Sequence, residues 1–570
     1  MKWVLKKKAN EKQVDKLSKE INVSKPIANL LVNRGVNNYK EAESFFRPNI
    51  NELHNPFLMK DMDKAVSRIE NAIKNNENVM IYGDYDVDGT TSVSMLYSFL
   101  KNKIKNITYY IPDRYTEGYG ISIKGIDFAK KEGYSLIIAL DCGIKANKQV
   151  DYALKNGIEF IICDHHEQGD VVPNAIAVLD PKQKECNYPF KELSACGVGF
   201  KLLQAFSEKN NIPPSEIMQY IDLVAVSIAS DIVPIINENR ILAYYGLKKI
   251  NSTPILGLKS IINIAKLTPN NIKISDIVFK IGPRINAAGR IEQGISSVDL
   301  LVNINEDDAI HIAQKIDDYN KERRQLDASI TQEAIDMIKQ NSFMQNKKST
   351  VLYNKNWHKG VLGIVASRVI EHFYKPTIIF TVSNGIATGS ARSVRDFNLY
   401  NAIEKCSHLI ENFGGHKYAA GLSVKEENID KFAELFERVV CESISTQSEF
   451  DIIEIDDEIS LKNINTNFYN ILNQFEPFGP QNMSPIFISK NVADTGYCKC
   501  IGKDNKHLRM YVTDKQTTES FQAIAFNMGD KYNIVKNSEF NICYNIEENT
   551  FNGKTNLQLN IKDIKADSDN

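Results

Sequence analysis

The sequence predicts an α/β protein made of a parallel sheet, a helical connector, a second α/β unit and a small C-terminal β-barrel. Short apolar runs alternate with helix-length segments from residue 79 to residue 179, a rhythm typical of strand–helix–strand units. Residues 240–340 are mostly helical in pattern, and residues 345–425 alternate again. Beyond residue 450 there are short strand-like runs separated by turn residues, the pattern of a small barrel.

The composition is that of a globular protein without strong overall charge. Of 570 residues, 43% are hydrophobic and 25% are charged, and the formal net charge is −2. This balance excludes a uniformly basic nucleic-acid binder, so a polyanion site must be a local patch. Nine irregularly spaced cysteines favour reduced thiols over a disulfide framework. No apolar run has the length of a signal peptide or membrane span, so we predict a cytoplasmic protein without a membrane partner.

The first half is predicted to form one parallel sheet. In chain order, the expected segments are strand 79–82, helix 90–100, strand 107–111, helix 121–132, strand 136–140, helix 145–156, strand 158–163 and strand 175–179. In a parallel sheet the carboxyl ends of all strands lie on one edge, where α/β proteins bind their ligands.

Acidic and imidazole side chains directly follow three of these strands. They are Asp84, Asp86 and Asp88 after the first strand, Asp141 after the third, and Asp164, His165 and His166 after the fourth. We expect them to converge on one crevice, because their strands end at the same edge. Clustered carboxylates suit Mg²⁺ or Mn²⁺. The simpler alternative is that these residues only cap the helices that follow.

A further acid, Asp231, ends an apolar helix-like run over residues 223–230, and Pro234 stops that run. A carboxylate at the carboxyl terminus of a helix is unfavourable, because the helix dipole is negative there. Either a nearby cation or a solvated loop would remove this objection.

This set of residues matches the needs of phosphodiester hydrolysis by two metal ions. Such sites use several carboxylates, one of them bridging the ions, and a proton donor for the leaving oxygen. We therefore predict a metal-dependent hydrolase that acts on phosphodiester bonds.

Longer strings around these residues resemble the DHH phosphoesterase superfamily, most specifically its RecJ single-stranded-DNA exonuclease family. The strings run in order along the chain at residues 82–89, 141–143, 164–166, 230–234 with 239–240, 281–290, 357–368 and 413–421. The resemblance implies two Mn²⁺ or Mg²⁺ ions. It also implies 5′-to-3′ degradation of single-stranded DNA to 5′-mononucleotides, in DNA repair and recombination.

By the same resemblance, the candidate residues form three groups. The metal ligands would be Asp84, Asp86, Asp88, Asp141, His165 and Asp231, with Asp141 bridging the ions. The catalytic residues would be Asp141, His166 at the scissile phosphate and Asp164 as its orienting partner, and the division of roles within the last pair stays open. The substrate-binding residues would be Arg114, Arg290, Ser390, Arg392, Gly415 and His416, with Ser390 and Arg392 holding a 5′-terminal phosphate.

The second half offers supporting patterns of its own. We expect strands at 350–353 and 376–381 and a helix at 363–373. The glycine and proline of residues 281–290 predict a turn. Alternatively, this segment presents Arg284 and Arg290 to phosphates. Residues 345–425 hold eleven Lys or Arg against four Asp or Glu, a local patch expected of a polyanion partner. The string 389–393 follows a predicted strand and combines small residues, hydroxyls and a guanidinium that suit phosphate.

The C-terminal segment is predicted to be an OB-fold. Its short strand candidates are 486–489, 507–512, 521–526, 540–544 and 557–561, and five such strands suit a small antiparallel barrel. Such barrels bind single strands through basic and aromatic side chains. The candidates are Tyr497, Lys499, Lys506, Arg509 and Tyr511, the alternative being ordinary exposed surface.

The predicted domains are a mostly helical extension at 1–75, a DHH catalytic domain at 76–245, a helical connector at 246–342, a DHHA1-like substrate-binding domain at 343–445 and an OB-fold at 450–565. By analogy with the family, the partners would be single-stranded DNA, a single-strand-binding protein and a RecQ-type helicase, and a monomer suffices. Two rival functions stay open. One is hydrolysis of oligoribonucleotides or cyclic dinucleotides, as in short DHH relatives, and the other is a scaffold that binds strands without cleaving them.

Overall fold

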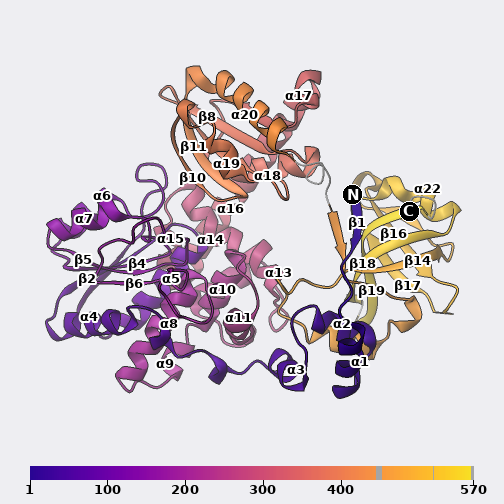
Figure 1. The fold of residues 1–570 in the computed structure, drawn as a ribbon, viewed down its shortest axis with the longest axis horizontal. Helices are drawn as coiled ribbons and strands as arrows, with labels where there is room; N and C mark the ends of the chain where they lie inside the picture. Colours follow the sequence, from indigo (N-terminus) through magenta and orange to yellow (C-terminus); the bar gives the residue numbers. More distant parts are fainter. Residues whose placement is uncertain (445–451, 518, 552, 567–570) are drawn as a thin grey trace. The chain divides into compact units, whose positions relative to one another are not determined.

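The computed structural model describes residues 1–444, 452–517, 519–551 and 553–566. The chain divides into two compact units (Figure 1). The large unit comprises Asn55–Asp231 and Gly246–Asp451, and the small unit comprises Met1–His54, Ile232–Tyr245 and Ile452–Asn570. Helix α11 (Asn237–Ile250) carries the chain from the small unit back into the large one.

A five-stranded parallel sheet forms the first half of the large unit, as the sequence predicts. Its strands are β2 (Asn78–Gly83), β3 (Asn106–Tyr110), β4 (Leu136–Leu140), β5 (Glu159–Cys163) and β6 (Ala177–Leu179). Their order across the sheet is β3-β2-β4-β5-β6, and every pairing is parallel. Strands β2, β4 and β5 are buried along almost their whole length, which explains their continuous apolar runs.

Helices cover both faces of this sheet (Figure 1). One face carries α6 (Ile123–Lys131) and α7 (Asn147–Lys155). The other carries α4 (Met62–Lys74), α5 (Val87–Leu100) and α8 (Ala195–Lys209). Helix α10 (Ile221–Ser230), which follows the short α9 (Ser215–Met218), packs on α5 and α8. Helix α10 is apolar on all sides because it is buried almost throughout.

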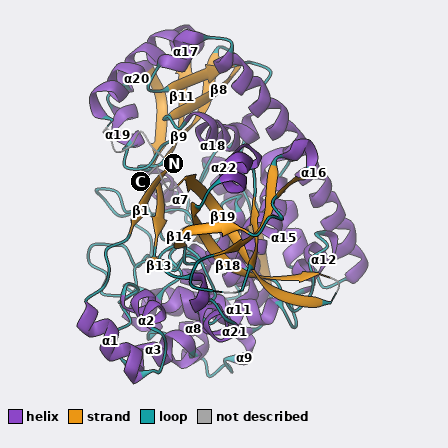
Figure 2. Cartoon of the chain, turned by 90° about the vertical axis from the view of Figure 1, so that its right-hand side faces the viewer, coloured by secondary structure: helices purple, strands orange, loops and turns teal. Residues whose placement is uncertain are grey.

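The connector is helical, as expected, but residues 281–290 are not a turn. The helices are α12 (Leu256–Ile264), α13 (Ile274–Asp276), α14 (Gly282–Ile291), α15 (Ile295–Leu301), α16 (Glu306–Lys339) and α17 (Ser342–Asn346). A π-helical segment, Ile277–Ile281, runs directly into α14. Pro283 does not break the helix because it lies in the first turn, where its missing N–H is not needed. Figure 2 shows α16 as one long helix, which packs on α12 and α14 and then on α18 (Leu362–Phe373).

The second α/β part of the large unit contains a mixed sheet. Its strands are β7 (Thr350–Tyr353), β8 (Thr377–Ser383), β9 (Ile386–Arg392), β10 (Ile410–Gly415) and β11 (Ala419–Lys425), in the order β10-β11-β9-β8-β7. Helices α19 (Leu399–Glu404) and α20 (Ile429–Ser443) complete it. The string 389–393 does not follow a strand but ends β9. Gly389 fits there because a Cβ would lie 2.4 Å from the ring of Phe380.

The small unit contains a barrel formed by the five predicted strands. They are β14 (Phe487–Asp494), β16 (His507–Thr513), β17 (Phe521–Ala525), β18 (Phe540–Phe551) and β19 (Lys554–Ala566), and pairing of β14 with β16 closes the ring. The shorter β13 (Asp457–Glu458) and β15 (Lys499–Ile501) extend the sheet, and α21 (Thr466–Asn473) and α22 (Tyr532–Asn537) flank it. The barrel is not wholly antiparallel, because β17 and β19 pair in parallel.

The chain's N-terminal segment belongs to the same core as the barrel. Helices α1 (Glu11–Glu20), α2 (Lys25–Val32) and α3 (Tyr39–Phe46) contribute residues such as Leu17 and Leu31 to a cluster that also holds Leu508 and Ile542. A strand that the sequence did not indicate, β1 (Lys2–Leu5), pairs in parallel with β12 (Ile452–Ile455). Within the described residues, no helix is both long and apolar enough to cross a membrane.

Candidate metal centre and phosphate pocket

The acidic residues of the first half lie where the order of the parallel strands reverses. Strands β2 and β4 are neighbours, whereas β3 lies on the other side of β2. At such a reversal the loops leaving the two strands diverge and open a crevice beyond their carboxyl ends. Asp84, Asp86 and Asp88 follow β2, and Asp141 follows β4. The two loops that carry these carboxylates therefore flank one crevice.

The loop after β2 folds back so tightly that it requires glycine. A Cβ on Gly89 would lie 2.3 Å from the backbone oxygen of Asp84. Asp86 accepts a hydrogen bond from the Gly89 N–H (3.1 Å) and caps α5, which explains why this helix begins at Val87 rather than at the expected Thr90. The capping interpretation therefore holds for Asp86, and it does not prevent the other carboxylates from gathering.

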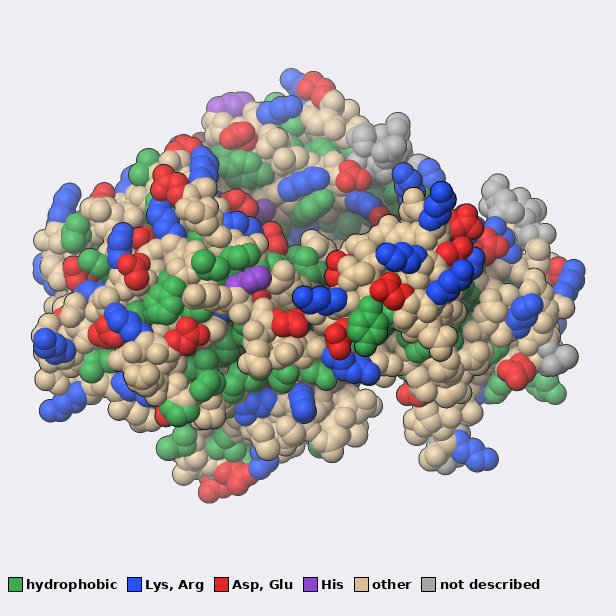
Figure 3. Space-filling view, turned by 60° about the horizontal axis from the view of Figure 1, so that its bottom comes forward, with side chains coloured by type: hydrophobic (Ala, Val, Ile, Leu, Met, Phe, Trp, Pro, Cys, Tyr) green, Lys and Arg blue, Asp and Glu red, His purple; other side chains and the backbone are tan. Residues whose placement is uncertain are grey.

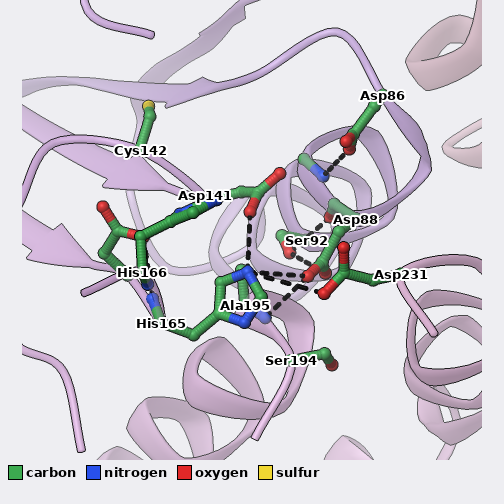
Figure 4. A network of polar contacts seen from close by, with 12 residues as sticks. Asp86, Asp88, Ser92, Asp141, Cys142, His165, His166, Ser194, Ala195 and Asp231 are labelled. Carbon is green, nitrogen blue, oxygen red and sulfur yellow. Dashed lines mark hydrogen bonds and ion pairs between the residues drawn. The ribbon is translucent and has the colours of Figure 1, made fainter. Parts of the chain in front are cut away.

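Three carboxylates meet at one ring nitrogen of His165 (Figure 4). Its Nε2 atom lies 3.3 Å from Asp141 Oδ1, 3.6 Å from Asp231 Oδ2 and 3.7 Å from Asp88 Oδ2. Asp231 reaches this point from the carboxyl terminus of α10, as the sequence suggested. Asp141 has a left-handed backbone (φ 63°), a conformation that Asp tolerates better than most residues.

Among the described residues, three sets of ligand-type atoms are close enough to hold a cation, with the atoms of each set within 4.8 Å of one another. They are Asp84, Asp86 and Asp141; Asp88, His165 and Asp231; and Asp141, His165 and His166. The third set and the short Asp141–His165 distance join the first two. The six predicted ligands are thus brought together, with Asp141 in the middle.

The electrostatics of the crevice favour divalent cations. Burial, and next the charges of neighbouring aspartates, raise the pKa of Asp84, Asp141 and Asp231 well above its ordinary value. Burial outweighs the charge of Asp88 and lowers the pKa of His165. Asp84 Oδ2 and both ring nitrogens of His165 are buried without a hydrogen-bond partner among the described residues. Buried carboxylates that repel one another, next to a neutral imidazole whose nitrogens have no hydrogen-bond partner among the described residues, fit Mn²⁺ or Mg²⁺.

Asp164 faces His166 rather than the cluster. Its Oδ1 lies 2.7 Å from His166 Nδ1, and its Oδ2 accepts a hydrogen bond from the Ile144 N–H (2.9 Å). Burial alone would lower the pKa of His166, but the hydrogen bond and charge of Asp164 outweigh it and raise that pKa to about 9. With Nδ1 engaged, the Nε2 atom of His166 is the one left to act; it lies 3.2 Å from the Tyr119 hydroxyl.

The predicted substrate-binding arginines gather beside the metal centre. The guanidinium of Arg114 lies 4.1 Å from the ring centroid of Tyr85, the residue between Asp84 and Asp86. Arg290 donates to the backbone oxygen of Gly360 (3.0 Å). Burial and the charges of Arg114, Arg323 and Arg392 lower the pKa of Arg290 to about 9. On the face drawn in Figure 3, Lys and Arg are interspersed with Asp and Glu. An anion bound among these arginines would relieve their mutual repulsion.

Ser390 and Arg392 point to the same side of β9, because alternate residues of a strand share a face. Gly363, in the first turn of α18, leaves room for them. A Cβ there would lie 2.6 Å from an Arg392 guanidinium nitrogen and 3.5 Å from Ser390 Oγ. His416 follows β10 directly after Gly415, and its ring stacks on that of His166. By contrast, Arg284 pairs with Asp317 (2.9 Å).

Three residues near the site were not singled out from the sequence. Tyr119 bonds to His166 and to the backbone oxygen of Asp141 (3.2 Å). Asp180 follows β6, and burial followed by the charge of Asp164 raises its pKa to about 7. Arg323 has a buried Nε without a partner among the described residues. Only Asp180 had a signal, since it is one more acid directly after a strand.

The chain matches three family models. They are the DHH family N-terminal domain at residues 78–228, the DHHA1 domain at 346–442 and the RecJ OB domain at 455–563. Among solved structures, RecJ in complex with Mn²⁺ from Thermus thermophilus shares the fold, with a TM-score of 0.85, 24% identity and coverage of 99% of this chain and 79% of that one. An exonuclease RecJ bound to manganese matches with a TM-score of 0.60 and 29% identity over 69% of this chain and 97% of that one.

Curated relatives are similar along nearly the whole sequence. The single-stranded-DNA-specific exonuclease RecJ of Bacillus subtilis is 35% identical over 566 residues, which is 99% of this chain and 70% of the relative. The protein of the same name from Escherichia coli is 30% identical over 89% of this chain and 90% of the relative. With this identity over most of both lengths, the chain belongs to the RecJ family of single-stranded-DNA-specific exonucleases.

Proposed function

We propose that this protein is a metal-dependent exonuclease that hydrolyses single-stranded DNA from its 5′ end to 5′-mononucleotides, in DNA repair and recombination. The observation that carries the proposal is the gathering of five carboxylates and His165 at the strand-order reversal, with Asp141 between two potential cation sets. The Mn²⁺-bound relative at 29% identity supports the same chemistry.

The proposed ligands of the two ions are Asp84, Asp86 and Asp141 for one and Asp88, His165 and Asp231 for the other, with Asp141 serving both. When bound, Mn²⁺ or Mg²⁺ supplies an activated water and neutralises charge on the phosphodiester. The protein's part is to hold these carboxylates close together despite their repulsion, within a buried crevice.

His166 is the proposed hydrogen-bond donor to the scissile phosphate and its leaving oxygen. Asp164 accepts the Nδ1 proton and fixes the ring, so the second nitrogen, Nε2, faces the crevice and is protonated in the imidazolium form. The raised pKa of His166 keeps that proton in place at neutral pH. Asp164 is itself held by backbone N–H groups of His165, His166 and Ile144, which supports an orienting role.

Arg114, Arg290, Ser390 and Arg392, with Gly415 and His416, are the proposed pocket for the 5′-terminal phosphate. Arginine suits this task because its planar fork binds phosphate oxygens in pairs. The mutual repulsion of the guanidiniums supports an anionic occupant. A fixed 5′ phosphate would set how far the strand enters and hence the release of one nucleotide at a time.

We further propose that the chain works as the five predicted domains, at residues 1–75, 76–245, 246–342, 343–445 and 450–565. The barrel would hold the incoming strand through Tyr497, Lys499, Lys506, Arg509 and Tyr511. Tyr497 is 72% exposed beside Tyr511, and Lys499 pairs with Arg509 across β15 and β16. The nine free thiols support action in the reducing cytoplasm. We also propose that the protein acts as a monomer and that its protein partners are a single-strand-binding protein and a RecQ-type helicase.

The test is a time course on end-labelled, 5′-phosphorylated oligonucleotides with Mn²⁺ or EDTA. Single-stranded DNA, duplex DNA, RNA and a 3′-phosphorylated strand are compared. Metal-dependent shortening of single-stranded DNA from the 5′ end, with duplex spared, supports the proposal. Cleavage confined to very short RNA would replace it with an oligoribonuclease, and strand binding without cleavage under any metal would replace it with a scaffold.

A further inference from the structure

The carboxylate of Asp88 is held by donors from two other helices. Its Oδ2 accepts the Ala195 N–H (2.8 Å), and its Oδ1 accepts the Cys196 N–H (2.9 Å). These N–H groups open α8, so the positive end of that helix dipole points at the carboxylate. The Ser227 hydroxyl, from α10, adds a third hydrogen bond to Oδ1 (2.7 Å).

The Ser227 hydroxyl is in turn held by Ser194, the residue that caps α8. The two Oγ atoms are 2.6 Å apart, and both side chains are completely buried. Each hydroxyl has one proton, and an ionised carboxylate can only accept. The single Ser227 proton therefore has two acceptors within reach, Asp88 Oδ1 and Ser194 Oγ, and the charged carboxylate is the stronger acceptor. Ser194 Oγ also accepts the Gly197 N–H (3.2 Å), so the Ser227 hydroxyl links Asp88 to the residue that caps α8.

This chain of hydrogen bonds ties together the three helices that carry or flank the metal centre. Asp88 lies in α5, Ser194 at the start of α8, and Ser227 in α10 one turn before Asp231. It therefore sets the separation of α5 and α10, whose carboxylates both approach the same His165 nitrogen.

We propose that Ser227, supported by Ser194, is a positioning residue for the metal centre that leaves Asp88 able to bind a divalent cation through Oδ2 alone. A carboxylate oxygen offers about two acceptor sites. Those of Oδ1 are occupied by Cys196 and Ser227, with Ser92 Oγ a further contact at 3.5 Å, whereas Oδ2 has one donor and lies toward His165. The inference rests on the proposed function, because it takes Asp88 as a ligand.

The expected effect of Ser227→Ala is a Mn²⁺ dissociation constant raised by about tenfold or more, since removing the partner of a metal ligand typically weakens metal binding by about 10–100-fold. At saturating Mn²⁺ kcat should recover to near the wild-type value, while the Mn²⁺ concentration for half-maximal activity stays raised. Ser194→Ala should have a smaller effect, and adding it to Ser227→Ala should raise the dissociation constant no further, because the relay is already broken.

The experiment is Mn²⁺ titration of the full chain, followed by electron paramagnetic resonance of free Mn²⁺ and by exonuclease assay. Ser94→Ala is the matched control. Ser94, in α5, is a buried serine like Ser227, but its hydroxyl donates to the Thr90 backbone oxygen (2.6 Å) and not to a carboxylate. Melting of the metal-free variants checks folding. If Ser227→Ala fails to fold, the same comparison is made with Ser194→Ala.

Wild-type Mn²⁺ affinity in Ser227→Ala, or a shift of equal size in Ser94→Ala, would overturn the inference. Fully additive effects of Ser194→Ala and Ser227→Ala would overturn the relay. If instead the wild-type protein itself neither binds Mn²⁺ nor degrades single-stranded DNA, the proposed function fails. The two failures are therefore distinguishable.

Discussion

The imidazole ring of His416 stacks on that of His166, with ring centroids 6.1 Å apart and planes 11° from parallel. His166 follows a strand of the parallel sheet, and His416 follows an edge strand of the mixed sheet, about 250 residues further along the chain. Both α/β parts of the large unit thus supply side chains to one site. A phosphodiester held there would meet the acidic groups of the first part and, from the second part, Arg392 and His416.

Asp141→Asn should abolish turnover while making the metal-free protein more stable. Asparagine tolerates the left-handed backbone of this position as well as aspartate does, but it removes one of the buried charges that repel one another. We expect kcat to fall by about a thousandfold or more and the melting temperature in EDTA to rise. Asp63→Asn, at an exposed aspartate of α4, is the control. A variant that keeps wild-type kcat would rule out Asp141 as a ligand.

Mn²⁺ should stabilise the large unit by mass action. At a free concentration of about 100 times the dissociation constant, a ligand that binds only the folded state adds about 2.7 kcal/mol. Differential scanning calorimetry with Mn²⁺ and with EDTA measures the shift. In Asp141→Asn the shift should largely disappear, and an equal shift in that variant would place the ion elsewhere.

Gly363→Ala should weaken the preference for a 5′-phosphate. The added Cβ would come within 2.6 Å of the Arg392 guanidinium and displace it from the pocket. A charged hydrogen bond is worth about 1.5–3 kcal/mol, so the ratio of kcat/KM for 5′-phosphorylated over 5′-hydroxyl strands should fall by about tenfold or more. Ile386→Ala, at the exposed start of the same strand β9, should keep the ratio. Loss of kcat/KM on both substrates alike would contradict the pocket assignment.

Tyr497→Ala with Lys499→Ala should weaken binding of long single strands and spare cleavage of very short ones. Stacking of one base on an aromatic ring is worth about 1–3 kcal/mol, which predicts at least a fivefold rise in the dissociation constant of a long oligonucleotide. Tyr39→Ala, at an exposed tyrosine of α3, is the control. Substitution is preferable to deletion of residues 450–570, because deletion would expose the core that α1 and α2 share with the barrel.

Arg240→Ala should destabilise the small unit without touching the metal centre. The Arg240 guanidinium donates to backbone oxygens of Phe45, Phe475 and Glu476 and lies 4.0 Å from the ring centroid of Phe45. Its removal leaves buried carbonyls unpaired, a loss of about 3 kcal/mol in the free energy of unfolding by urea. Mn²⁺ affinity should not change. Unchanged stability together with weakened Mn²⁺ binding would contradict this assignment.

The sequence by itself determined the parallel sheet, its helices and the acids at its edge. Strand–helix alternation is local, and it forces all the strand ends to one side, so the pattern alone suffices to group Asp84, Asp141 and His165. The five strands of the barrel were equally visible, because each is a short apolar run between turn residues.

Only the tertiary structure decided which of these parts meet. Three contacts depend on burial shared between distant segments. They are the pairing of β2 with β4, the parallel pairing of β17 with β19, and the stacking of His416 on His166. The same holds for Ser194 and Ser227. In the sequence they are ordinary serines of apolar helices, and only the folded structure shows that Ser227 contacts Asp88 and that Ser194 contacts Ser227. Local pattern specifies an element and its buried face, whereas the partner that covers that face is chosen by packing across the whole chain.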